Sequence, residues 1–171
     1  MTSSTQKTRF SIITFLSVLV VLAVLAVAAA LVFSPFRHLQ LASAVDRVLS
    51  DVRYCQEMAI YADVPYGIAF EPARSRYTIC RYEGGKRAGV RDPATKAFPW
   101  RIDFTAGVYK GFKIAFAEDG GGSELVFAAG AGVPCGAGGA PLKKRASVSV
   151  TSSAGTITVN VDPQTGYAWR S

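Results

Sequence analysis

The sequence predicts an α+β fold in which one long N-terminal helix packs on a C-terminal antiparallel β domain of about six or seven strands. Residues 12–33 are almost uniformly apolar, and residues 41–59 then repeat their apolar positions with a helical period. From Val64 onward the period changes to two, which is typical of strands. Because the chain has 171 residues, the part beyond the helical third is enough for one small globular domain.

The first element is an apolar segment, Ile12 to Phe33, whose only polar side chains are Thr14 and Ser17. It is long enough for a bilayer core, which takes roughly 20 residues of helix. A removed secretory signal is the competing interpretation, since Lys7 gives a basic head, but the apolar region of a signal is usually about 7–15 residues long. We therefore expect a cytoplasmic basic leader over residues 1–9 and a retained transmembrane helix over residues 10–34.

The second element is an amphipathic extension of the same helix over residues 35–62. Apolar residues recur there at intervals of four and three, namely Leu41, Val45, Val48, Val52, Cys55 and Ala59. Pro35 need not end the helix, because a proline at the end of a membrane span can kink the axis and let it continue. We expect the stripe to cover the sheet of its own domain, and the part nearer the span to pack against helices of neighbouring proteins.

The third element is the β domain, residues 63–171. Alternating apolar residues predict seven strands, centred on residues 64–70, 77–79, 100–104, 112–116, 125–127, 148–150 and 157–161. Turn clusters separate them at residues 118–123, 152–155 and 162–166. Residues 83–99 and 130–144 are rich in glycine or charge, which predicts irregular structure.

The orientation follows from charge, because basic residues beside a span tend to stay on the cytoplasmic side. Lys7 and Arg9 place the N-terminus inside and the β domain outside the cytoplasm.

In an oxidising compartment disulfides persist. Cys80 and Cys135 form the candidate disulfide because both fall in predicted sheet or loop, whereas Cys55 lies on the apolar face of the helix.

Catalytic patterns are weak, and we expect neither enzymatic activity nor a cofactor or metal. The single histidine, His38, flanks the apolar segment, where a nucleophile–histidine pair would have to form at the bilayer surface. Glu118 and Asp119 are adjacent in a glycine-rich turn, which favours turn formation; a loosely bound calcium ion at these residues and Glu124 is the alternative.

The formal net charge is +7. A basic surface can attract phosphate backbones or anionic lipid, although scattered solvated charges are the simpler interpretation. The candidate anion or DNA contacts are Lys143, Lys144, Arg145 and Arg170.

The whole chain resembles the type IV pilin-like proteins, and within them the H-type minor pseudopilins of type II secretion systems and the related FimT-like minor pilins. The resemblance rests on the basic head and long helix, and on the order and spacing of four segments. These are V-P-Y-G-I-A-F-E-P-A-R-S-R-Y-T-I at 64–79, F-A-E-D-G at 116–120, E-L-V-F-A-A-G at 124–130 and T-I-T-V-N-V-D-P-Q-T-G-Y at 156–167. It implies a pilin-like fold and a structural role.

The resemblance also implies an assembly chemistry at the N-terminus. In this family a prepilin peptidase cuts after a glycine, the new N-terminal residue is methylated, and a glutamate four residues further on pairs with a neighbour's amine. Aligning F-S-I-I-T-F-L on the family pattern puts Phe10 at the mature start, Arg9 in place of the glycine and Thr14 in place of the glutamate. We therefore expect an uncut N-terminus and no recruiting charge, as in subunits at a filament tip.

The function implied is that of a minor pseudopilin in a type II secretion pseudopilus or related filament, at or near its tip. Its partners would be other pseudopilins through the helix, the inner membrane and the prepilin peptidase. One alternative is a FimT-like minor pilin that binds DNA for uptake. Another is a membrane-anchored extracytoplasmic binding domain outside any filament.

Overall fold

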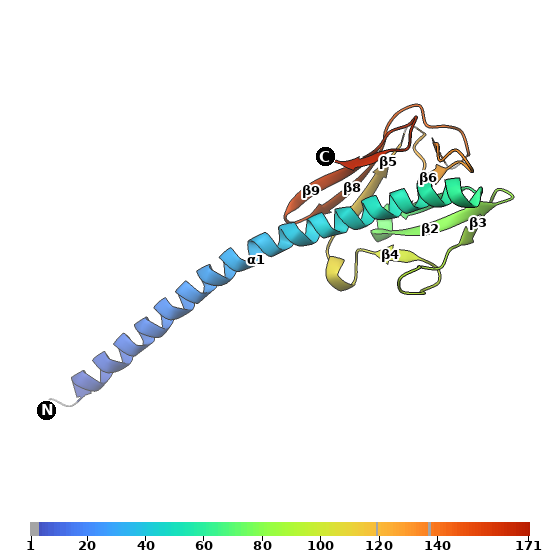
Figure 1. Cartoon of the computed structure of the whole chain (residues 1–171). Helices are drawn as coiled ribbons and strands as arrows, with labels where there is room; N and C mark the ends of the chain where they lie inside the picture. The colour runs from blue at the N-terminus through green and yellow to red at the C-terminus, as the bar shows by residue number, and fades with distance from the viewer. Residues whose placement is uncertain (1–3, 119, 137) are drawn as a thin grey trace. The chain divides into compact units, whose positions relative to one another are not determined.

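The computed structural model describes residues 4–118, 120–136 and 138–171, without the side chains of residues 4–13 and 28–35. The chain forms two compact units, Met1–His38 and Leu39–Ser171. The helix α1, Ser4–Ala62, belongs to both (Figure 1). It continues through Pro35 and ends at Ala62.

The first unit consists of the N-terminal part of α1. Every large apolar side chain from Phe15 to Val27 is more than half exposed. Among the residues whose side chains are described, no helix is at once long enough and apolar enough to cross a membrane. The predicted span over residues 10–34 lies in part outside those residues.

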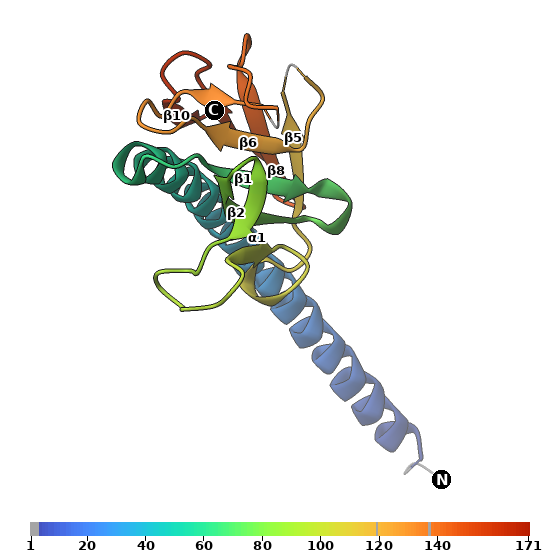
Figure 2. The same cartoon turned by 90° about the vertical axis from the view of Figure 1, so that its right-hand side faces the viewer.

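The second unit contains two antiparallel sheets (Figures 1 and 2). The larger has the order β3-β2-β1-β6-β7, with β4 also paired to β2. Its strands are β1 (Tyr66–Glu71), β2 (Arg76–Glu83), β3 (Lys86–Gly89), β4 (Arg101–Asp103), β6 (Glu124–Phe127) and β7 (Pro134–Cys135). The smaller has the order β10-β9-β8-β5, with β5 (Lys113–Ala117), β8 (Ala146–Ser152), β9 (Gly155–Val161) and β10 (Ala168–Arg170). Two short 3₁₀ helices, η1 (Pro72–Arg74) and η2 (Gly107–Tyr109), complete the unit.

The predicted fold class is confirmed, but the described residues form ten strands rather than six or seven. The seven alternating segments all become strands, and β3, β7 and β10 are additional. β3 and β7 lie in the segments 83–99 and 130–144, for which irregular structure is predicted. β3, β7 and β10 show no alternation of apolar residues, and each forms because a longer neighbour provides the pairing.

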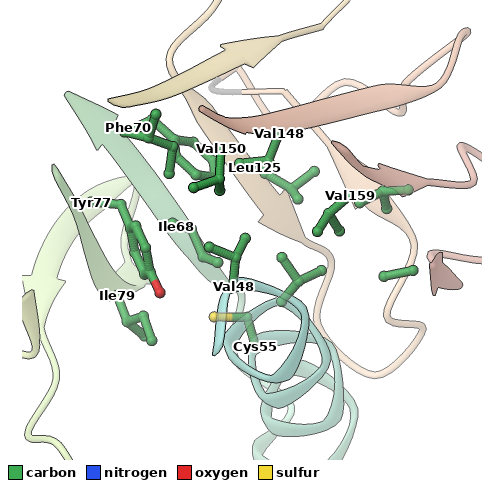
Figure 3. Packing of buried hydrophobic residues seen from close by; sticks show 14 of the residues in the cluster. Val48, Cys55, Ile68, Phe70, Tyr77, Ile79, Leu125, Val148, Val150 and Val159 are labelled. Atoms are coloured by element: carbon green, nitrogen blue, oxygen red, sulfur yellow. The ribbon is translucent and has the colours of Figure 1, made fainter. Parts of the chain in front are cut away.

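The core lies between α1 and the two sheets. The predicted stripe is confirmed, because Leu41, Val45, Val48, Val52, Cys55 and Ala59 are each at most 2% exposed. Figure 3 shows Val48 and Cys55 on the helix among Ile68 and Ile79 of the larger sheet and Val148 and Val159 of the smaller one. One helix therefore closes the core of both sheets.

Candidate interaction surface

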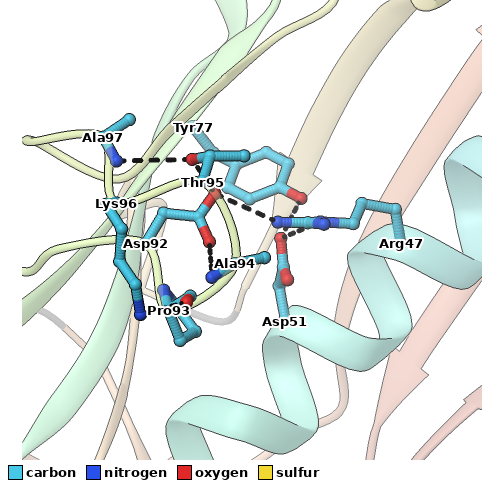
Figure 4. Close-up of polar contacts among 9 residues, drawn as sticks. All are labelled: Arg47, Asp51, Tyr77, Asp92, Pro93, Ala94, Thr95, Lys96 and Ala97. Atoms are coloured by element: carbon cyan, nitrogen blue, oxygen red, sulfur yellow. Dashed lines mark hydrogen bonds and ion pairs between the residues drawn. The ribbon is translucent and has the colours of Figure 1, made fainter.

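A buried polar network joins α1 to the larger sheet (Figure 4). Arg47 and Asp51 are one helical turn apart, and the Arg47 Nε donates to Asp51 Oδ2 at 3.1 Å. The Tyr77 hydroxyl, from β2, donates to the same oxygen at 2.6 Å. Asp51 is 3% exposed, and this burial raises its pKa above the usual aspartate value, although the hydrogen bonds from Tyr77 and Arg47 oppose the rise.

The sequence contains one signal for this network, a charged residue on the apolar face of the helix, which a search for apolar periods alone does not detect. Asp51 comes three residues after Val48 and four before Cys55. That spacing places its carboxylate on the apolar face of the helix, where a charged group needs a partner. Tyr77 and Arg47 provide that pairing in the fold.

The network continues into the segment Arg91–Pro99, which we call the basic loop. Asp92 is 5% exposed and lies 4.0 Å from Arg47. Its carboxylate accepts hydrogen bonds from the Ala94 amide at 2.8 Å and the Thr95 hydroxyl at 2.7 Å. Although burial opposes it, these bonds hold the pKa of Asp92 below its usual range. Asp92 therefore stays ionised and fixes the turn at residues 93–95.

Trp100 attaches the end of the basic loop to the helix. Its ring meets Tyr54 of α1 edge to face, with centroids 4.8 Å apart, and the Arg47 guanidinium lies 5.8 Å from its centroid. The Trp100 amide donates to the Val90 carbonyl at 2.8 Å, and the Trp100 carbonyl accepts from the Ile79 amide at 3.0 Å. Both ends of the basic loop are thus held against buried structure.

The rest of the basic loop faces solvent. Residues 93–99 are all exposed, and Phe98 presents 64% of its surface. One side of the Phe98 ring rests on Gly89 of β3, where an added Cβ would come within 3.0 Å of the ring. A side chain at position 89 would displace the Phe98 ring by a few tenths of an ångström.

A second exposed cluster lies at the C-terminus. Tyr167 is 60% exposed, and its ring stacks near Trp169 of β10 with centroids 6.0 Å apart. The Arg145 guanidinium lies 5.4 Å from the centroid of Trp169. We call Arg145, Tyr167 and Trp169 the aromatic cluster.

The four predicted anion contacts do not form one site. Arg145 joins the aromatic cluster, and Lys144 lines the same shallow surface pocket as Arg145. Lys143 instead lines a cavity of about 480 Å³ beside Glu118. Arg170 is ion-paired with Asp46 of α1 at 3.3 Å, on the opposite side of β10 from Trp169.

The alternative calcium site is not assembled by the described carboxylates. Glu124 accepts hydrogen bonds from Tyr82, at 2.7 Å, and from Arg87. Glu118 accepts from the Gly122 amide at 3.0 Å, and its pKa is raised by burial. Asp119 lies outside the described residues. Within the described part of the chain, no three acidic, histidine or cysteine side chains cluster as metal ligands do.

The predicted disulfide between Cys80 and Cys135 is not present. Strand register places Cys80 opposite Gly67, Gly67 opposite Val126, and Val126 opposite Cys135. Three strand spacings separate the two cysteines, about 14 Å, whereas bridged Cα atoms lie within about 7 Å. All three cysteines are buried free thiols, and burial raises the pKa of each. The spacing of cysteines in sequence carries no information about the strand order β2-β1-β6-β7, which separates them.

The predicted assembly residues lie in the first unit. Thr14 is exposed on α1, and its carbonyl accepts a hydrogen bond from the Ser17 hydroxyl at 2.9 Å. The side chains of Arg9 and Phe10 lie outside the described part of the structure. Their roles in processing stay predictions.

No protein-family model and no curated protein matches the chain. Solved structures do match. The minor pseudopilin EpsH from the type II secretion system of Vibrio cholerae aligns with a TM-score of 0.57 and 10% sequence identity, over 77% of this chain and 96% of that one. The type IV minor pilin FimU of Pseudomonas aeruginosa PAO1 aligns with a TM-score of 0.51 and 14% identity, over 79% and 90% of the two chains.

These likenesses extend over part of α1 as well as the β domain, since they cover more than three quarters of the chain. At identities of 10% and 14% they establish the fold. The protein therefore has the pilin-like α+β fold of minor pseudopilins and minor type IV pilins.

Proposed function

We propose that the protein is a minor pseudopilin, a structural subunit of a type II secretion pseudopilus or related pilin-like filament. The observation that carries the proposal is the fold, which EpsH shares over 77% of this chain and 96% of its own. The role is structural, and assembly with other pilin-like subunits is its activity.

The proposal includes a single membrane span over residues 10–34, with the β domain in the periplasm. The apolar composition of residues 12–33 supports it, as does the exposure of every large apolar side chain from Phe15 to Val27. A surface of this kind is stable in lipid or against the helices of neighbouring subunits. Other pseudopilins would pack on this part of α1, and the prepilin peptidase would meet the residues preceding Phe10.

The identity of Thr14 supports a position at or near the filament tip. In pilin-like subunits a glutamate at the corresponding position pairs with the amine of a neighbour, because an unpaired carboxylate is costly in a membrane. The Thr14 side chain carries no charge. A subunit with nothing above it needs no such carboxylate.

Cysteine cross-linking tests the assembly directly. The native thiols are at most 4% exposed, so Val21→Cys introduces the one accessible thiol among the described residues, on the exposed face of α1. In membranes of the host that makes the filament, we expect the new thiol to form a disulfide with a cysteine placed at the same membrane depth in the helix of another pseudopilin. The matched control is Ser50→Cys, on the part of α1 that belongs to the folded domain.

Two results separate the possibilities. Cross-linking by Val21→Cys but not by Ser50→Cys supports helix-mediated assembly. A full-length chain that neither cross-links to nor co-purifies with any pseudopilin is a membrane-anchored binding domain outside a filament, and the proposal is then wrong.

A second candidate function is DNA binding for uptake, and the aromatic cluster is the observation in its favour. Single-stranded nucleic acid binds where exposed aromatic rings accept bases beside cationic side chains. Tyr167, Trp169 and Arg145 provide both chemistries. Arg170 is excluded from this surface by its pairing with Asp46.

A gel shift with the full-length detergent-solubilised chain and a single-stranded oligonucleotide tests this candidate. If DNA is bound here, Tyr167→Ala and Arg145→Ala weaken binding about tenfold, consistent with about 1–3 kcal/mol per stacked base. Arg170→Ala is the control and leaves binding unchanged. A dissociation constant for DNA that does not change with salt concentration counts against phosphate contacts.

A further inference from the structure

The basic loop combines exposure with rigidity. Beyond the bonds made by the Asp92 side chain, the Asp92 amide donates to the Ala97 carbonyl at 2.9 Å, and the Lys96 amide donates to the Asp92 carbonyl at 2.9 Å. The Arg47 guanidinium holds Asp92 from the helix side. An exposed segment fixed in this way loses little conformational freedom on binding.

Basic residues outnumber acidic ones around this loop, although Arg87 is paired with Glu124 and the exposed Glu83 lies opposite Lys86 in the β2–β3 ladder. Residues 84–101 carry five basic residues, Lys86, Arg87, Arg91, Lys96 and Arg101, and a single carboxylate, Asp92. Asp92 is 5% exposed, whereas all five basic residues are exposed. Phe98 therefore lies as an apolar side chain within an electropositive surface.

The two cations of the basic loop donate hydrogen bonds to carbonyl groups of the loop itself. Arg91 donates to the Lys96 carbonyl at 2.9 Å, and the Lys96 ammonium donates to the Pro93 carbonyl at 2.7 Å. Nucleic-acid surfaces instead track a backbone with a series of cations and several stacking rings. A single large aromatic anchor on a rigid support, with a polar rim, is the arrangement found at protein–protein hot spots.

We propose that the basic loop is a docking surface for an acidic protein partner, with Phe98 inserted into an apolar pocket that carboxylates surround. A second copy of this chain is a poor occupant, because its net charge is also +7. Resting on the proposed function, the partner is a different, acidic subunit of the same filament.

The test compares subunits co-purified with the tagged full-length chain, solubilised in detergent from the host that assembles the filament. The variants are Phe98→Asp, Phe98→Leu and Tyr61→Asp. Tyr61 is the matched control, since it is an aromatic residue with 89% exposure on α1. We expect Phe98→Asp to lower the yield of one acidic subunit at least tenfold, and Phe98→Leu and Tyr61→Asp to retain it. Raising the salt concentration lowers the same yield in the wild type, because the rim charges are solvent-exposed.

Each other result overturns the inference. Unchanged yields with Phe98→Asp, or an equal loss with Tyr61→Asp, mean that the loop is not the docking surface although filament assembly stands. A wild-type chain that brings down no filament subunit removes the proposed function and this inference together. Binding to single-stranded DNA or to phosphatidylglycerol vesicles that Phe98→Asp abolishes assigns the loop to nucleic acid or membrane instead.

Discussion

At the scale of single residues, Asp51 links α1 to the larger sheet, and burying its carboxylate costs free energy. Its carboxylate lies on the apolar face of α1 and accepts hydrogen bonds from Tyr77 and Arg47. Breaking a buried pair by removing one partner costs about 3–5 kcal/mol, because the other group is left buried and unpaired. Replacement by a neutral group of the same shape avoids that loss.

Asp51→Asn is expected to change how stability depends on pH. The folded pKa of Asp51 lies above the unfolded value, so the folded state keeps the proton to higher pH. The contribution of Asp51 to the free energy of unfolding therefore falls as pH rises from about 4 through the folded pKa, by at most about 1.4 kcal/mol per pH unit. The asparagine variant lacks this fall, so its free energy of unfolding relative to wild type improves as pH rises. Chemical unfolding of both chains between about pH 4 and pH 7 measures the difference, and a difference independent of pH contradicts the role of Asp51.

Thr14 allows a test of the tip position. Thr14→Glu places a carboxylate in the apolar helix, and at a tip no neighbouring amine pairs with it. We expect Thr14→Glu to reduce the amount of chain recovered with the filament, and Thr14→Val to leave it unchanged. Quantitative immunoblotting of sheared filaments provides the measurement. Increased recovery of Thr14→Glu argues for a position inside the filament.

At the scale of elements, α1 holds the domain together through its apolar stripe. Val48 is fully buried between the helix and the sheets. Val48→Ala is expected to lower the free energy of unfolding by about 2–3 kcal/mol through lost burial and a residual cavity. Ser50→Ala, at an exposed position on the same helix, should stay within about 0.5 kcal/mol of wild type. Denaturant unfolding followed by circular dichroism checks both values, and equal effects contradict the packing of Val48 in the core.

The elements differ in how far the sequence predicts them. Long strands such as β1 and β9 present alternating apolar residues to the core, so their pattern is visible in the chain. β3 has its pairing set by β2, and no local signal marks it. The prediction of irregular structure is correct for residues 91–99, but no local signal marks the ion pair of Asp92 with Arg47, which lies far away in sequence.

At the scale of the whole molecule, the helical period and the strand alternation are enough to predict the α+β fold class, because burial imposes both patterns. The candidate surfaces are less predictable. The four basic residues selected as anion contacts lie at three different places, since neighbouring positions on β10 face opposite sides and a salt bridge holds Arg170. Charge composition indicates that a surface is basic, whereas only the fold shows which charges lie together.

The intact mass of the full-length chain tests the processing prediction. With Arg9 in place of the family's glycine, we expect the residues before Phe10 to remain attached. Mass spectrometry of the chain purified from the host membrane distinguishes the two forms. A mature chain that begins with a methylated Phe10 shows that the peptidase accepts arginine at this position.

The helix stripe also has a mechanical consequence. The apolar stripe of α1 packs in one core with both sheets. A force applied along the helix is therefore transmitted to both sheets at once. If one sheet separated from α1 while the other stayed packed, the common core would open. In single-molecule pulling through α1, we expect the domain to rupture in one event, and two successive ruptures would show that the sheets yield independently. This coupling makes the domain respond to load as one solid body.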